Sequence, residues 1–150
     1  MNVLVLVLLI LVGAVLIQAA VWIPITRSWR RKRVQYDTAF SAEVLASGER
    51  TIIAPEDAVY RGSTGTYGTV RGNGTILLTD HRLVFRKKSG GVVDIPVAKI
   101  AGSSESKSFL SSRVGGMTHL VVTTTDPAQV GFFVSDLAAW QRALDGVRTH

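Results

Sequence analysis

The chain has 150 residues, no cysteine and a formal net charge of +6. The length allows one domain of ordinary size, and the absence of cysteine excludes disulfide bonds, thiolate zinc sites and cysteine nucleophiles. Five of the 17 basic residues lie between positions 27 and 33, and the other 12 nearly balance the 11 acidic residues. Because most of the chain is close to neutral, its charge does not predict nucleic-acid binding.

The stretch from Val3 to Ile23 has no charged side chain and consists almost wholly of valine, leucine, isoleucine and alanine. A helix over these 21 residues spans about 31 Å, close to the ~30 Å hydrocarbon core of a bilayer. We therefore expect a transmembrane anchor over residues 1–26. A cleaved signal peptide is the alternative, with Gln18 to Ala20 as its cleavage site, but such peptides have a basic start and a shorter apolar stretch.

Basic residues follow this apolar stretch and none precedes it. Because basic flanks tend to stay on the cytoplasmic side, we expect a single-pass protein of the cell membrane with its amino terminus outside and its domain in the cytoplasm. One basic cluster is a candidate contact for lipid headgroups, with the setting of topology as its simpler role: Arg30, Arg31, Lys32 and Arg33.

Residues 27–48 are expected to form a basic juxtamembrane linker that ends in a short helix from Tyr36 to Ser47. Asp37 or Thr38 is a candidate N-cap, Phe40 and Val44 have helical spacing, and Gly48 is a stop signal.

Beyond Gly48 the pattern changes to short strand-like runs separated by turn residues, which predicts a mainly-β domain over residues 49–150. Asn73-Gly74 and the glycines at positions 90 and 91 suit tight hairpins. The expected strands are Thr51–Ala54, Ala58–Arg61, Tyr67–Arg71, Thr75–Thr79, Arg82–Lys87, Val92–Pro96, His119–Thr124 and Gln129–Val134.

The chain ends in a helical pattern, with Leu137, Trp140, Leu144 and Val147 on one face and Ser135 as candidate N-cap. This amphipathic helix is expected to cover the open end or seam of a small antiparallel structure. The predicted fold class is an N-terminal transmembrane helix followed by an α+β domain, in which about seven antiparallel strands form a sandwich or partly open barrel capped by this helix.

The run from Gly74 to Phe85 resembles the signature hairpin of the GRAM and bacterial pleckstrin-homology-like (PH-like) families. Leu45 with Gly48-Glu49 upstream, and Ile95-Pro96-Val97 downstream, are similar to neighbouring elements of these families. The resemblance implies a PH-like domain that binds a lipid, a protein or no known ligand. The residues that carry the signature are Gly74, Leu78, Thr79, Asp80, Arg82, Leu83 and Phe85.

Within this hairpin, the apolar residues are expected to face the core, and Thr79, Asp80 and Arg82 are expected to shape the turn. Arg82 either binds an anion or pairs within the fold. Members of the superfold that bind inositol phosphates carry several basic residues on the first hairpin, whereas residues 61–74 offer only Arg61 and Arg71.

Two further groups of residues are candidate contacts. Arg86, Lys87 and Lys88 form a basic run beside a turn, and they either contact lipid headgroups or form a solvated hairpin tip. Phe109 and Leu110 lie in the polar stretch from Ser103 to Gly116, and they either contact a partner or are buried beneath the loop.

The histidines, His81, His119 and His150, do not have the spacing of a catalytic or metal site. We therefore expect no enzyme, no metal and no cofactor. The predicted function is a membrane-anchored adaptor that binds a protein or anionic lipid, with the bilayer and a membrane or cytoplasmic protein as partners. The alternative is a structural subunit of a membrane complex, with Gly13 and Gln18 facing another helix, and a membrane-tethered enzyme comes third.

Overall fold

A computed structural model of the chain describes residues 38–44 and 46–149. In this part of the chain no helix is long and apolar enough to cross a membrane. The helix α2 (Leu137–Arg148), for example, has 12 residues and spans about 18 Å, well short of the ~30 Å core of a bilayer. The predicted fold class included a transmembrane helix, and this part of the prediction is wrong for the described residues. Residues 1–26, on which it was placed, lie outside the described residues.

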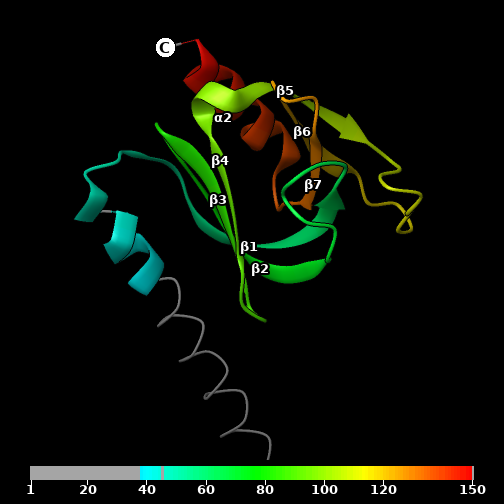
Figure 1. Cartoon of the computed structure of the whole chain (residues 1–150), viewed down its shortest axis with the longest axis horizontal. Helices are drawn as coiled ribbons and strands as arrows, with labels where there is room; N and C mark the ends of the chain where they lie inside the picture. The colour runs from blue at the N-terminus through cyan, green and yellow to red at the C-terminus, as the bar shows by residue number, and fades with distance from the viewer. Residues whose placement is uncertain (1–37, 45, 150) are drawn as a thin grey trace, which may run out of the picture. The chain divides into compact units, whose positions relative to one another are not determined.

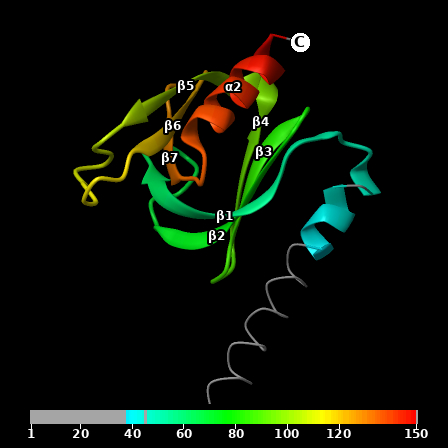
Figure 2. The ribbon, with the colours of Figure 1, turned by 180° about the vertical axis from the view of Figure 1, so that it is seen from behind.

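Seven antiparallel strands form one sheet in the order β4-β3-β2-β1-β7-β6-β5. The strands β4 and β5 are its two edges, and α2 packs against β5, β6 and β1, as Figures 1 and 2 show. This sheet with a C-terminal helix fits the PH-like fold predicted from the sequence. The elements are β1 (Thr51–Ser63), β2 (Gly72–Thr79), β3 (Arg82–Lys87), β4 (Val92–Pro96), the 3-10 helix η1 (Val97–Lys99), β5 (Ile100–Ser106), β6 (His119–Thr124) and β7 (Gln129–Phe133).

The long strand β1 has 13 residues where the sequence predicted two separate strands. Its pairing with β2 shifts register between Ile53 and Glu56, around Pro55. Because proline has no N–H to donate to a neighbouring strand, it is tolerated at such an irregularity. The last residues of β1 pair with β7, so this one strand joins the two halves of the sheet.

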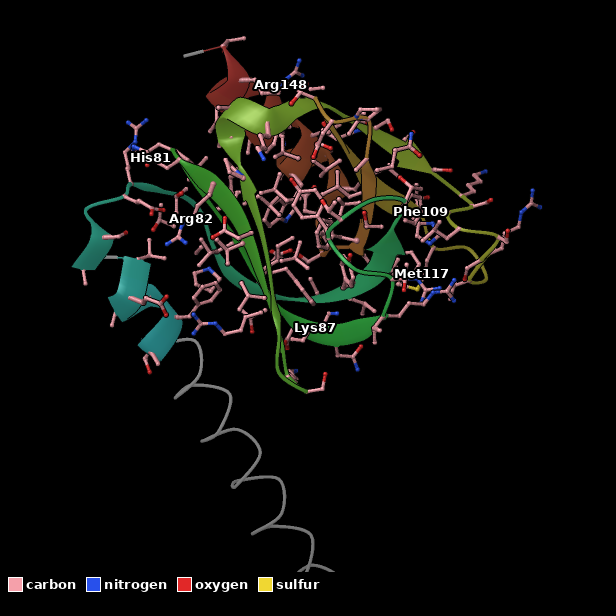
Figure 3. The ribbon with its side chains drawn as sticks, viewed as in Figure 1. His81, Arg82, Lys87, Phe109, Met117 and Arg148 are labelled. Atoms are coloured by element: carbon pink, nitrogen blue, oxygen red, sulfur yellow. The ribbon has the colours of Figure 1, made fainter. Side chains whose placement is uncertain are left out.

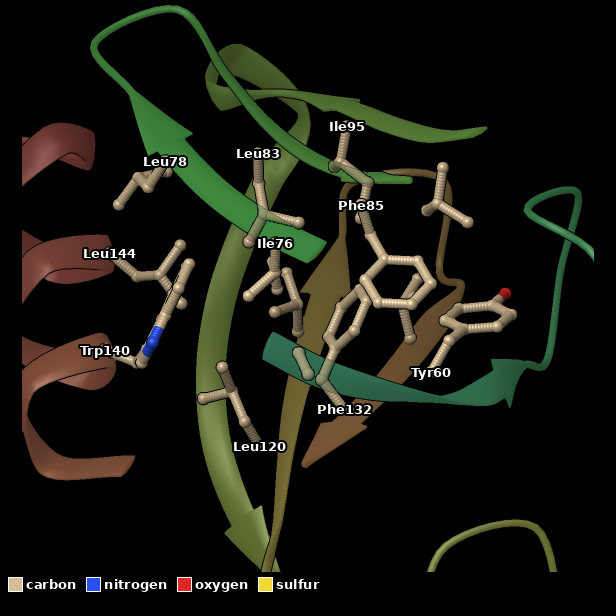
Figure 4. Packing of buried hydrophobic residues seen from close by; sticks show 14 of the residues in the cluster. Tyr60, Ile76, Leu78, Leu83, Phe85, Ile95, Leu120, Phe132, Trp140 and Leu144 are labelled. Carbon is tan, nitrogen blue, oxygen red and sulfur yellow. The ribbon is translucent and has the colours of Figure 1, made fainter. Parts of the chain in front are cut away.

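The core lies between the curved halves of this sheet and α2 (Figure 4). At its centre the ring centroids of Tyr60, Phe85 and Phe132 lie 5.6–5.7 Å apart, a separation typical of favourable aromatic packing. Leu78 and Leu83, which the sequence assigned to the core together with Phe85, are fully buried.

The helix α2 contributes Trp140 and Leu144 to the same core. Its N-cap is Asp136, whose Oδ1 accepts a hydrogen bond from the amide of Ala139 at 3.0 Å. The predicted cap, Ser135, is one residue too early. Its hydroxyl instead donates to Oε2 of Glu56 on β1, at 2.7 Å.

Residues 38–44 and 46–47 are helical, inside the segment for which a helix was predicted. Phe40 and Val44 are buried against Leu77 and Val84, which lie on the face of β2 and β3 away from the core. The compact unit that contains the sheet begins at Phe40. Phe40 and Val44 therefore pack as part of this unit.

Candidate functional site

The turn between β2 and β3 is held by the hydroxyl of Thr79. This buried oxygen accepts hydrogen bonds from the amides of Arg82 and His81, at 3.0 and 3.2 Å, and donates to Oε2 of Glu49 at 2.8 Å. A short β-branched side chain that bonds to nearby backbone amides is a common way to close a tight turn. Thr79 thus connects both sides of the turn and Glu49.

Asp80 links this turn to the chain before β1. Its Oδ1 accepts a hydrogen bond from the amide of Arg50 at 2.9 Å and lies 2.8 Å from Nδ1 of His81. The bond with His81 is the main cause of a lowered pKa at Asp80. The side chain of His81 is 70% exposed. Among the described residues, no three His, Cys, Asp or Glu side chains form a metal site.

Arg82 pairs with two carboxylates inside the fold. Its Nε lies 3.0 Å from Glu49, and its Nη1 lies 2.8 Å from Asp94. Hydrogen bonds to Asp94 and then to Glu49 raise the pKa of Arg82. Burial opposes ionisation of Glu49, but hydrogen bonds from Thr79 and Arg82 outweigh it and lower the pKa of this carboxyl. Arg82 thus pairs within the fold, which is the second of the two alternatives stated from the sequence.

The basic run on β3 does not form one surface. Successive residues of a strand point to opposite faces, so Arg86 and Lys87 are separated by the sheet. Arg86 stacks on Phe40, with its Cζ 4.4 Å from the ring centroid, and pairs with Glu43 at 2.6 Å. The Nζ atom of Lys87 lies over the ring of Tyr60, 4.8 Å from its centroid.

Lys88, the next residue, pairs with Asp57 at 3.1 Å. Arg86, Lys87 and Lys88 thus each contact a side chain of the domain. The other predicted contacts, Arg30, Arg31, Lys32 and Arg33, lie outside the described residues.

The loop between β5 and β6, residues 107–118, is anchored by the ring of Phe109. Phe109 is 5% exposed and lies 6.1 Å from the ring centroid of His119, which in turn lies 4.4 Å from that of Phe133. The ring of Phe109 fills the space above Gly131, where a Cβ would lie 2.4 Å from its Cδ1. Of the two alternatives for this residue, burial beneath the loop is the one that the structure shows.

Leu110 and Ser111 form the tip of this loop and have positive φ, at 47° and 58°. The flanking residues are Phe109 and Ser112, and the amide of each donates a hydrogen bond to the carbonyl oxygen of the other, at 3.1 and 3.0 Å. With two residues of positive φ between them, this is the pattern of a type I′ turn. Such a turn favours Asn-Gly, and a residue with a branched side chain is strained there by about 1–2 kcal/mol. Leu110 is 38% exposed, so its side chain contributes to the surface that the loop presents.

Two arginines hold this turn, Arg61 near the end of β1 and Arg71 directly before β2. Nη2 of Arg61 donates to Oγ of Ser112 at 2.5 Å, and Nη2 of Arg71 donates to the carbonyl oxygen of Leu110 at 3.3 Å. The guanidinium of Arg61 also stacks on Phe133, with 5.0 Å between Cζ and the ring centroid. Its buried Nε has no hydrogen-bond partner among the described residues.

We name the set of Arg61, Arg71, Leu110 and Ser112 the arginine–loop surface. Burial and, second, the nearby charge of Arg71 lower the pKa of Arg61. In the part of the chain that the structure describes, neither arginine pairs with a carboxylate. Four other basic residues of the domain do: Arg82, Arg86, Lys88 and Arg148.

Sequence reasoning noted Arg61 and Arg71 but did not bring them together with Leu110. A signal was available, because both loops that meet at this surface lack acidic residues. No Asp or Glu occurs between Asp57 and Asp80 or between Glu105 and Asp126, and these stretches carry four basic residues. Figure 3 shows Phe109 and Met117 on the second of these loops.

Tyr60 connects the β1–β2 loop to the core. Its hydroxyl donates to the carbonyl oxygens of Tyr67 and Gly68, at 3.0 and 2.5 Å. Burial raises the pKa of Tyr60 to about 12. The folded state therefore keeps this proton at a pH where an unfolded tyrosine, with a pKa of about 10, loses it. The stability that the neutral phenol contributes is fully present below pH ~10 and is lost as the pH rises towards ~12.

We expect the free energy of unfolding to fall more steeply between pH ~10 and ~12 in the wild type than in Tyr60→Phe. Urea unfolding at a series of alkaline pH values measures this slope. The variant lacks the hydroxyl and its hydrogen bonds at every pH, so the comparison is between slopes and not between absolute stabilities. Equal slopes would show that Tyr60 ionises in the folded state as it does in the unfolded chain.

No sequence-family profile matches the chain, and no curated protein matches it either. Among solved structures, the C-terminal domain of an unknown protein from Leishmania infantum is similar, with a TM-score of 0.54 and 14% identity, over 77% of this chain and 99% of that chain. The pleckstrin homology domain of USP37 has a TM-score of 0.44 and 16% identity, over 61% of this chain and 96% of that chain. At such identity the first similarity shows a shared fold alone.

Proposed function

We propose that this PH-like domain is a protein-binding module that holds an acidic segment of a partner at the arginine–loop surface. The observation that carries the proposal is the pair Arg61 and Arg71, which lie beside the same turn without a carboxylate partner in the described part of the chain. A carboxylate from a ligand would form charge-assisted hydrogen bonds with these guanidinium groups. No chemical step is proposed for the module.

The composition of the surface favours a protein partner over a lipid headgroup. Val70, which is 71% exposed, directly precedes Arg71 in the chain, and Leu110, which is 38% exposed, accepts a hydrogen bond from Arg71 through its carbonyl oxygen. Arginine beside apolar side chains is typical of protein interfaces, from which lysine is depleted. The residues predicted to contact headgroups near the end of β3 have partners of their own: Lys87 lies over Tyr60, Lys88 pairs with Asp57 and Arg86 pairs with Glu43. The cytoplasmic location of the domain stays a prediction.

The test uses the full-length protein in a mild neutral detergent and a fluorescein-labelled polyglutamate peptide as the probe. Fluorescence anisotropy should show binding that weakens with salt, because the interaction is between charges near the surface. Arg61→Gln and Arg71→Gln should each weaken binding roughly tenfold, since hydrogen bonds between charged groups contribute about 1.5–3 kcal/mol.

The matched control is Arg142→Gln, which removes the same charge from an exposed position on α2 and should leave the affinity unchanged. A polyglutamine peptide of equal length should not bind. Thermal unfolding of each variant by circular dichroism checks that the fold is intact. If inositol trisphosphate, a soluble lipid headgroup, binds with the same arginine dependence and polyglutamate does not, the ligand is a lipid and the protein-partner proposal is wrong.

A further inference from the structure

The turn at Leu110 and Ser111 is held in a conformation that its own sequence does not favour. Neither residue is glycine, asparagine or aspartate, yet both have positive φ. The contacts that hold the turn come from elsewhere in the chain: Phe109 in the space above Gly131, and the guanidinium groups of the two arginines. Strain that tertiary contacts maintain is frequently found where a segment has a functional role.

The oxygens that the turn offers to the arginines are neutral. They are the hydroxyl of Ser112 and the carbonyl of Leu110. A guanidinium bonds more strongly to a carboxylate than to a neutral oxygen, because the opposite charges also attract each other. A carboxylate that reached the same Nη2 atoms would therefore replace these oxygens, and the turn would lose the two bonds that fasten its tip to the β1–β2 loop.

We infer that the β5–β6 loop competes internally for the two arginines of the arginine–loop surface: the Ser112 hydroxyl and the Leu110 carbonyl occupy the positions that oxygens of an acidic partner segment take. This inference rests on the proposed function. Binding then requires the loop to release both arginines. The observed affinity is therefore the intrinsic affinity multiplied by the fraction of molecules whose arginines the loop has released. Release also relieves the strain at Leu110 and Ser111.

Two substitutions that leave the arginines untouched should change the affinity in opposite directions. Ser112→Ala removes one competing oxygen, and we expect polyglutamate to bind about fivefold more tightly. Ser111→Gly suits the positive φ, strengthens the turn and keeps the side chain of Leu110, so we expect binding roughly threefold weaker. Ser104→Ala, at an exposed position of β5, is the control and should have no effect.

Hydrogen exchange gives a second measurement on the wild-type protein. The amides of Phe109 and Ser112 are bonded across the turn, and that of Met117 is bonded to the carbonyl of Val114. Saturation with polyglutamate should accelerate exchange at Phe109 and Ser112, because the released turn opens more often.

The outcomes separate this inference from the proposed function. If the arginine variants lose binding while Ser112→Ala and Ser111→Gly bind as the wild type does, the site is real and the loop does not compete for it. Slower exchange at Phe109 and Ser112 on binding would also overturn the inference, since the peptide would then be adding to the turn instead of displacing it. If Arg61→Gln and Arg71→Gln bind normally, both proposals fail.

Discussion

Replacement of Gly74 by alanine is expected to destabilise the domain by about 3 kcal/mol or more. Gly74 pairs with Lys87 across the β2–β3 hairpin, where a Cβ would lie 2.2 Å from the carbonyl oxygen of Arg86 and 2.6 Å from Cζ of Phe85. The first of these atoms belongs to the backbone and the second to a ring at the centre of the core. Neither moves without disturbing the register of the hairpin or the aromatic cluster.

Gly72→Ala is the matched control, because it adds the same methyl group two positions earlier on the same strand. The nearest atoms to a Cβ there are Cδ and Cγ of the Lys87 side chain, at 3.8 and 3.9 Å, which is ordinary contact. We expect this variant to stay within about 1 kcal/mol of the wild type, as a strand glycine replaced without a clash usually does. Chemical unfolding followed by far-ultraviolet circular dichroism measures both. Similar unfolding midpoints for the two variants would show that the hairpin accommodates the extra methyl group.

Replacement of Glu56 by alanine is the second large change, expected to lower the free energy of unfolding by about 2–3 kcal/mol. The carboxylate of Glu56 accepts hydrogen bonds from the indole Nε1 of Trp140 at 2.9 Å and from the amide and hydroxyl of Ser135 at 3.1 and 2.7 Å. Trp140 is 1% exposed. Without Glu56 its indole N–H is left without this acceptor in a buried position, and the start of α2 loses its connection to β1.

Two variants make this prediction specific. Glu56→Gln keeps one acceptor oxygen for Trp140, and we expect it to lose only about 1 kcal/mol. Asp57→Asn, at the next position, removes the charge from an exposed ion pair with Lys88, and surface pairs of this kind contribute about 0–1 kcal/mol. A loss in Asp57→Asn as large as that in Glu56→Ala would mean that negative charge on β1, and not the bond to Trp140, stabilises this region.

The β2–β3 hairpin could be predicted from the sequence because its determinants are local. Leu78 and Leu83 flank the turn and point into the core, and the Thr79 hydroxyl bonds to amides within three residues. Alternation and turn chemistry act over such short distances, so a single sequence carries them. The partner that Thr79 gains in Glu49, 30 positions earlier, was not predictable in this way.

The strand β5 shows why one element was missed. Its residues from Gly102 to Ser106 are glycine, serine and glutamate, with no apolar alternation to indicate a buried face. The segment is a strand because β6 pairs with it, from Ile100 opposite Thr124 to Ser106 opposite His119. Long-range pairing overrides weak local propensity, and composition alone therefore suggested a loop.

By itself, the sequence determined the mainly-β domain, the signature hairpin and the amphipathic C-terminal helix, because these follow from periodicity and turn residues that act within a few positions of one another. Only the tertiary structure decided which basic side chains have partners within the domain and which lie at the proposed binding surface. Alternation along β3 placed Arg86 and Lys87 on opposite faces with partners of their own. Chain segments some 40 to 50 positions apart brought Arg61 and Arg71 to a strained turn. Ion pairing and burial depend on distance in space, which cannot be read from distance along the chain.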